Sequence, residues 1–201
     1  LGSGYSVAIK FILETYKQNA GEIVSLSYRY PDDFNKDAIS ERFPGQIRFV
    51  ESLLEDLNPE QLGRFDVITN VAGPLSYATH LDIALYNAIR MLKLGGKLIS
   101  HHPTPGSESR VVYSYDLKME MDLINYLESI KGVKFKFGRG ELKTGPSFVL
   151  ERTNEEIEVP LLMLWQYEMM KPPLRKYQLA SPQETQRVLS AGDFTMRLRP
   201  Q

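Results

Sequence analysis

The chain has 201 residues, of which 42% are hydrophobic and 24% are charged, and its formal net charge is -1. This size and composition are typical of one globular domain with a substantial core, and the near-neutral charge gives no support for binding nucleic acid or a membrane surface. The absence of cysteine excludes disulfides, thiolate metal sites and cysteine nucleophiles. No apolar stretch reaches the length of a membrane span and no signal peptide is visible, so we expect a cytoplasmic protein.

The first quarter of the sequence alternates between helical and extended patterns. Residues 2–6 are a glycine turn that leads into an amphipathic helix, which Gly21 ends. The segment 22–27 predicts a buried strand, 36–43 a short helix and 47–50 another strand. Strands and helices that alternate in this way are typical of an α/β fold built on a parallel sheet.

The stretch 65–100 predicts the central β-α-β unit. An apolar run at 65–68 suits a strand that is buried on both faces, Gly95-Gly96 stops the helix that follows, and 97–100 resumes as a strand. The helix is indicated by apolar residues at helical spacing, namely Leu81, Leu85, Ala88 and Leu92. Open parallel sheets bind ligands beyond the carboxyl ends of their strands, so we expect the functional site in the segments 70–77 and 100–105.

The rest of the sequence predicts a sheet edge and a C-terminal extension. An amphipathic helix spans 116–130, and the segments 133–137 and 147–152 predict an antiparallel strand pair. Residues 161–170 are rich in Met, Leu and aromatic side chains, which indicates core packing but also leaves open a cover over the site, or a contact with a protein partner or a second copy of the chain. Ser181, Pro182 and Glu184 form a capping box that predicts a C-terminal helix.

Three segments, taken in order, resemble the class I S-adenosylmethionine-dependent methyltransferases: LGSGYSVAIKFI, FDVITNVAGPL and HLDIALYNAIRMLKLGGKLIS. The likeness spans residues 1–152, although Leu94 stands where that family usually has proline. The resemblance implies a doubly wound, mostly parallel Rossmann-like sheet with an antiparallel terminal strand pair, over 1–153. Beyond this likeness, we expect 154–201 to be a C-terminal helical appendage that packs on the domain.

The resemblance implies S-adenosylmethionine as the cofactor. It also implies which positions would hold it: Gly2, Ser3, Gly4, Ser27, Glu51, Asn70, Ala72 and Gly73. Residues 70–74 would face the transferred methyl group.

Departures from the family pattern keep a second class of function open. Ser27-Tyr28 stands where the family prefers the acidic residue that takes the ribose hydroxyls, and a hydroxyl lacks the charge-assisted, two-point grip of a carboxylate. The acidic residue that lies near the adenine in relatives is Glu51, or is absent if the register points to Leu53, and Ser6 stands at the third glycine of the turn. The alternative is therefore a non-catalytic binding or scaffold subunit on the same fold.

The three histidines of the chain all fall near the predicted carboxyl-end segments. His80, His101 and His102 are therefore the candidates for a general base, alongside plain capping or solvated roles. Methyl transfer can also proceed through positioning and desolvation without a base.

The sequence shows neither a metal site nor a substrate signature. No set of His, Asp and Glu has metal-ligand spacing. Gly73-Pro74-Leu75 replaces the Asn/Asp-Pro-Pro-aromatic signature of many enzymes that methylate amino groups on nucleic acid, and the sequence identifies no substrate.

Three further expectations concern topology. Residues 70–73 are similar to the asparagine-alanine-glycine motif of short-chain dehydrogenases, but the connection from Ala72 to Gly95 is too short for that family. Residues 191–194 are similar to a helix end that precedes the sixth strand in some methyltransferases, yet 147–152 fits the last strand better. The first strand of the fold would precede Leu1, so we expect a longer protein, or a segment outside this numbering, to supply it.

Overall fold

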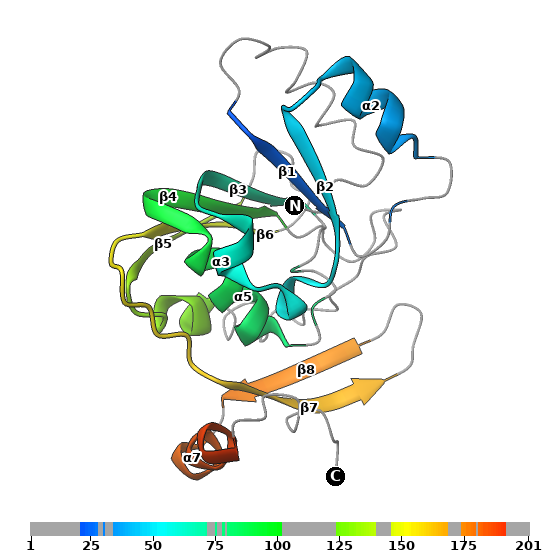
Figure 1. Cartoon of the computed structure of the whole chain (residues 1–201). Helices are drawn as coiled ribbons and strands as arrows, with labels where there is room; N and C mark the ends of the chain where they lie inside the picture. Colours follow the sequence, from blue (N-terminus) through cyan, green and yellow to red (C-terminus); the bar gives the residue numbers. More distant parts are fainter. Residues whose placement is uncertain are drawn as a thin grey trace.

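The computed structural model of the chain describes residues 21–27, 30, 34–71, 75, 78, 80–101, 124–139, 146–168, 174–179 and 181–191. Strands and helices alternate along this part of the chain, so the predicted α/β class is confirmed (Figure 1). Six of the predicted site residues lie outside the described residues: Gly2, Ser3, Gly4, Ala72, Gly73 and His102.

The first two strands form a parallel pair. β1 (Ile23–Ser27) and β2 (Ile47–Glu51) are connected through α2 (Lys36–Arg42), as predicted. An apolar cluster joins α2 to one face of this pair, with Ile39 and Phe43 buried against Ile23, Phe34, Ile47 and Phe49. The other face contributes Val24, Leu26 and Val50 to the main core. Apolar packing on both faces is what a doubly wound sheet requires.

The second sheet has the strand order β3-β4-β6-β5. β3 (Phe65–Val71) and β4 (Leu92–His101) are parallel, whereas β6 (Pro146–Arg152) is antiparallel to both β4 and β5 (Val133–Arg139). The predicted antiparallel pair at the sheet edge is therefore confirmed. β5 is the edge strand, and β6 is the last strand of this sheet in chain order. Within the described residues no ladder joins β1 to β3, and a strand between them stays a prediction.

A helical layer covers one face of the four-stranded sheet (Figure 1). It consists of η1 (Leu54–Asp56), α3 (Pro59–Leu62), α5 (Leu81–Arg90) and the helical residues 124–128. The main core lies between this layer and the sheet and includes the fully buried side chains of Leu54, Leu85, Leu98 and Leu150. Burial of these large apolar side chains is the principal stabilising contribution to this part of the fold.

The central helix is shorter than its periodicity predicts. α5 ends at Arg90, and Leu92, which continues the apolar spacing of the helix, instead begins β4. The guanidinium of Arg152 donates to the carbonyl oxygens of Arg90 and Leu92 at 3.2 and 2.7 Å, and these bonds fix the chain in the turn out of the helix. Gly95, with a φ of 77°, and Gly96 consequently lie inside the strand rather than at the helix end.

The C-terminal extension differs from the predicted helical appendage because a hairpin precedes its helix. β7 (Leu162–Glu168) and β8 (Leu174–Leu179) are antiparallel, and α7 (Pro182–Ala191) follows. The capping box of α7 is confirmed, since the Ser181 amide donates to Glu184 Oε2 at 2.7 Å and the Glu184 amide donates to Ser181 Oγ at 3.3 Å. No helix in the described part of the chain is long and apolar enough to cross a membrane.

Candidate functional site at the carboxyl ends of the strands

The carboxyl ends of β1 and β2 bring two predicted cofactor residues side by side. Ser27 and Glu51 are partners in the parallel ladder, and the Ser52 amide donates to the Ser27 carbonyl oxygen at 3.0 Å. The Glu51 side chain is 45% exposed and forms an ion pair with the ammonium of Lys36. This end of the strand pair therefore carries a hydroxyl beside a carboxylate, and the carboxylate already has one cation bound to it.

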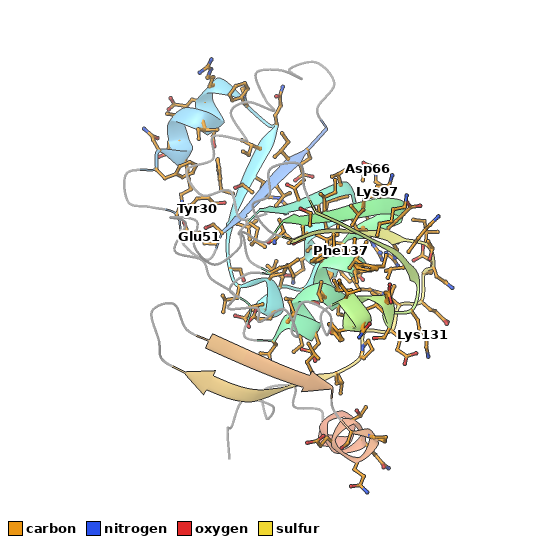
Figure 2. All side chains as sticks on the ribbon, turned by 180° about the vertical axis from the view of Figure 1, so that it is seen from behind. Tyr30, Glu51, Asp66, Lys97, Lys131 and Phe137 are labelled. Carbon is orange, nitrogen blue, oxygen red and sulfur yellow. The ribbon has the colours of Figure 1, made fainter. Side chains whose placement is uncertain are left out.

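Tyr30 lies at the same end of the strand pair and was not predicted as part of the site. Figure 2 shows Tyr30 and Glu51 next to each other, and the Lys36 Nζ lies 5.2 Å from the centre of the Tyr30 ring. The ring stacks on Phe34 with centroids 5.0 Å apart and meets Phe49 edge-on at 5.5 Å. The only sequence signal for this cluster is the concentration of aromatic residues just after β1.

The phenol of Tyr30 is held against the backbone of β1. Its oxygen lies 2.7 Å from the Ser25 carbonyl oxygen, to which it donates, and 2.8 Å from the Ser25 hydroxyl. Burial raises the pKa of the Tyr30 phenol against the opposing effect of its hydrogen bond to Ser25, and the charge of Glu51 also raises it. Tyr30 therefore stays protonated at neutral pH and has the role of a fixed hydrogen-bond donor.

The end of β3 is organised by Asn70. Its side chain is fully buried, its Nδ2 donates to the Ser100 hydroxyl at 2.9 Å, and its Oδ1 accepts from the Leu75 amide at 3.1 Å. The first bond ties β3 to the end of β4, and the second joins the end of β3 to Leu75. Both ends of the amide are used within the protein, so Asn70 fixes the walls of this region, and its direct contact with a ligand stays a prediction.

Two of the three histidines lie within the described residues. His80 is half-buried at the N-terminus of α5, where its carbonyl oxygen accepts from the Ala84 amide at 2.9 Å. His101 is the last residue of β4 and pairs with Val71 of β3 and Ser147 of β6. Both thus belong to elements that border the carboxyl ends, but a catalytic role stays a prediction for each. In the described part of the chain, no group of three His, Asp or Glu side chains could hold a metal ion.

Comparison with solved structures identifies the fold. The CMeT domain of the citrinin polyketide synthase matches with a TM-score of 0.53 at 14% identity, over 76% of this chain and 45% of that chain. The 1,6-didemethyltoxoflavin-N1-methyltransferase of Burkholderia thailandensis, solved with S-adenosylhomocysteine bound, matches with a TM-score of 0.50 at 14% identity, over 76% and 69%. The cyclase SpnF matches with a TM-score of 0.51 at 14% identity, over 76% and 73%.

These matches define the class of fold. The chain has the fold of the class I S-adenosylmethionine-dependent methyltransferases, as the sequence resemblance implies. It spans less than half of the length of the first of these structures. No family model matches the sequence, and neither does any curated protein. The inclusion of a cyclase among the matches means that the reaction has to be argued from the site.

Proposed function

We propose that the protein is a methyltransferase that uses S-adenosylmethionine. The observation that carries the proposal is the pairing of Ser27 with Glu51 at the carboxyl ends of two parallel strands, on a methyltransferase fold. Ligands of open α/β sheets bind at this edge. A cytoplasmic location stays a prediction.

The residues at this edge fit the polar part of the cofactor. The Ser27 hydroxyl stands at the ribose position and can form one hydrogen bond there, while Glu51, its partner on the next strand, has a partly exposed carboxylate that can accept hydrogen bonds from the adenosine part of the cofactor. Lys36 weakens the hydrogen bonds that Glu51 could accept from the cofactor, because its ammonium competes for the same carboxylate. When bound, S-adenosylmethionine supplies a methyl group on a sulfonium, which is an electrophile for direct displacement.

The remaining residues would contribute position rather than covalent chemistry. Asn70 ties the end of β3 to Ser100 of β4 and to Leu75, and this would fix one boundary of the space in which a methyl acceptor lies. His80 and His101 stand on the elements around that boundary and are the proposed bases for an acceptor that must lose a proton. The acceptor itself is not identified by these groups.

The test is calorimetric titration of the purified full-length protein with S-adenosylmethionine and S-adenosylhomocysteine. We expect binding, and we expect Glu51→Gln to weaken it by about tenfold, because hydrogen bonds to a charged group contribute roughly 1.5–3 kcal/mol. Glu60→Gln is the matched control, since Glu60 is also an exposed carboxylate in an ion pair, here with Arg90. A folded wild type that binds neither compound would contradict the proposal, and so would equal effects of the two variants.

A non-catalytic binding or scaffold subunit is the second candidate. It is favoured by the hydroxyl at Ser27, where the family prefers a carboxylate, and by the Lys36 cation on Glu51. Together they reduce the negative charge that is available to bind the cofactor. In that case the folded protein would bind neither cofactor nor product. Binding of a protein partner or a second copy through residues 161–170 stays a prediction, to be tested by the oligomeric state in solution.

A further inference from the structure

The segment 153–162, which we call the strap, connects β6 to β7 across the helical layer (Figure 1). It begins in close contact with Gly132, whose carbonyl oxygen accepts from the amides of Thr153 and Asn154 at 2.9 and 3.2 Å. Gly132 has a φ of 81°, and a Cβ at this position would lie 2.3 Å from the Glu156 carbonyl oxygen. The strap passes so close to the backbone here that only glycine fits.

Further contacts fix the strap along its length. Lys131 and Glu158 exchange backbone hydrogen bonds at 3.0 and 3.2 Å, and their side chains form an ion pair at 2.8 Å. The buried Tyr126 then donates its hydroxyl proton to the Pro160 carbonyl oxygen at 3.0 Å. These bonds define one path for the strap, so the place where β7 begins is set by the body of the fold.

The strap ends at a buried carboxylate. The Asp82 side chain is 2% exposed, and its Oδ2 accepts from the Leu162 amide at 3.0 Å across a separation of 80 residues. Its Oδ1 accepts from the Ile83 amide at 2.9 Å, which orients the carboxylate in the first turn of α5. A charged acceptor that is buried and bonded to a backbone amide is a strong and directional anchor.

This anchor lies next to the elements of the candidate site. Asp82 is two residues beyond His80, at the N-terminus of the helix that follows the carboxyl end of β3. The buried Leu162 side chain belongs to the same core cluster as Leu75, whose amide is held by Asn70 at the end of β3. The first residue of β7 is therefore bonded to the start of the helix that follows the carboxyl end of β3.

We infer that the hairpin β7–β8 forms one wall of the methyl-acceptor site, and that Asp82 is the positioning residue that holds it there. This inference rests on the proposed function, because it concerns the acceptor side of the same strand ends. The hairpin would then select the acceptor, while Ser27 and Glu51 hold the cofactor at the carboxyl ends of β1 and β2.

The single tryptophan of the chain, Trp165, lies in β7 and allows a direct test. The full-length protein and three variants would be titrated with S-adenosylhomocysteine by calorimetry and by tryptophan emission, and amide hydrogen exchange would be measured for residues 162–179. The variants are Asp82→Ala, which removes the acceptor, Asp82→Asn, which keeps an acceptor oxygen, and Asp66→Ala. Asp66 is a matched control because it is an exposed aspartate, bonded to Lys93, at the other end of β3.

In the wild type, saturation with S-adenosylhomocysteine should change the emission of Trp165, because the sulfur of this compound adjoins the space in which the methyl acceptor would lie. In Asp82→Ala the emission change should be lost while the calorimetric affinity stays within about threefold, and exchange in 162–168 should rise by about tenfold, since a local anchor is lost. Asp82→Asn should keep most of the emission change, and Asp66→Ala should behave as the wild type. A general loss of the fold in Asp82→Ala would lower the calorimetric affinity as well, so a lost emission response with retained affinity reports on the hairpin alone.

Two results would overturn the inference, and they differ from a failure of the proposed function. Calorimetric binding without any emission change in the wild type would show that the hairpin does not border the site. An unchanged emission response and unchanged exchange in Asp82→Ala would show that Asp82 does not position the hairpin. If the folded wild type does not bind S-adenosylhomocysteine at all, the proposed function fails, and the wall assignment fails with it.

Discussion

Two of the sheets, the four-stranded sheet and the β1–β2 pair, are held together by different kinds of interaction. In the four-stranded sheet and its helical layer, buried polar side chains bond carbonyl groups that are distant in sequence. Asn87, for example, is 6% exposed, and its Nδ2 donates to three carbonyl oxygens of the segment that follows β2: Leu54 at 3.0 Å, Glu55 at 3.3 Å and Leu57 at 3.1 Å. Arg152 donates to carbonyl groups in the same way just beyond the C-terminal end of α5, whereas Asp82, in the first turn of α5, accepts from the Leu162 amide.

The β1–β2 pair relies on an aromatic cluster and on exposed ion pairs. Tyr30, Phe34 and Phe49 pack together, while Glu22–Arg48 and Lys36–Glu51 lie at the surface. Exposed ion pairs contribute only about 0–1 kcal/mol each, whereas leaving a buried polar group without its partner costs roughly 1–3 kcal/mol. The comparison indicates that the four-stranded part is rigidly specified, and that the strand pair with the proposed cofactor residues tolerates local change.

The largest expected effect is at Arg152, whose side chain is fully buried. Besides the carbonyls of Arg90 and Leu92, its guanidinium donates to the Asn154 carbonyl at 3.0 Å and to the carbonyl and carboxylate of Glu155 at 2.9 and 2.8 Å. Arg152→Met removes all of these bonds at once. We expect the free energy of unfolding to fall by about 3–5 kcal/mol, measured by chemical denaturation.

Arg48 supplies the control in the other sheet. Its side chain is 42% exposed and bonds Glu22 and the Leu62 carbonyl oxygen, both at 3.0 Å. Arg48→Met should lower the free energy of unfolding by no more than about 1.5 kcal/mol. Equal losses in the two variants would remove the distinction between the two sheets.

The second prediction concerns two glycines with similar backbone angles. Gly45, before β2, has a φ of 71° and nothing within 4 Å of an added Cβ, while Gly132 has a φ of 81° and a carbonyl oxygen 2.3 Å from that position. Gly45→Ala should cost only the left-handed strain, about 1–2 kcal/mol. Gly132→Ala should cost roughly 3 kcal/mol, because displacement of the strap adds to the strain. Denaturation curves that coincide would mean that the strap moves aside freely.

The third prediction compares the same deletion in the two regions. Tyr30→Phe and Tyr126→Phe each remove one buried hydroxyl that donates to a carbonyl oxygen, and each should cost about 1 kcal/mol. Amide exchange should separate them. Tyr30→Phe should raise exchange within residues 23–27 and 47–51, and Tyr126→Phe within the strap. Faster exchange throughout the molecule in Tyr30→Phe would show that the strand pair does not respond as a local unit.

The parts of the fold that were predicted from the sequence are those specified by local patterns. Periodicity and capping located α2, the strands around α5, the antiparallel pair β5–β6 and the N-terminus of α7. The predicted end of α5 was wrong because Leu92 continues the apolar spacing of the helix. The hydrogen bond from Arg152 to the carbonyl of Leu92 spans 60 residues. No local signal can report such a contact.

The hairpin and most of the site could not be predicted from the sequence, for related reasons. The segment LMLWQYE is apolar without strict alternation, so it does not distinguish a strand from a helix. For the site, the resemblance correctly indicated which strand ends meet, since Ser27 and Glu51 are ladder partners. The remaining features depend on tertiary contacts that appear only when the chain is folded. These are the hydrogen bonds of Asn70 within the protein, the packing of Tyr30 and the anchor at Asp82.

The smallest expected effect is at the capping box of α7, which lies outside both sheets. The hydrogen bonds from the Ser181 backbone and side chain lower the pKa of the Glu184 carboxyl below its ordinary value. The cap therefore contributes stability above the ordinary glutamate pKa, and this contribution is lost as the pH falls through the lowered value. An NMR titration of the Glu184 carboxyl carbon should show the lowered pKa, Ser181→Ala should return it toward the ordinary value, and Ser181→Thr should keep it low. Because α7 belongs to neither sheet, these changes should leave the unfolding of the two sheets unaltered, and a shift in their denaturation midpoint would show that α7 is coupled to them.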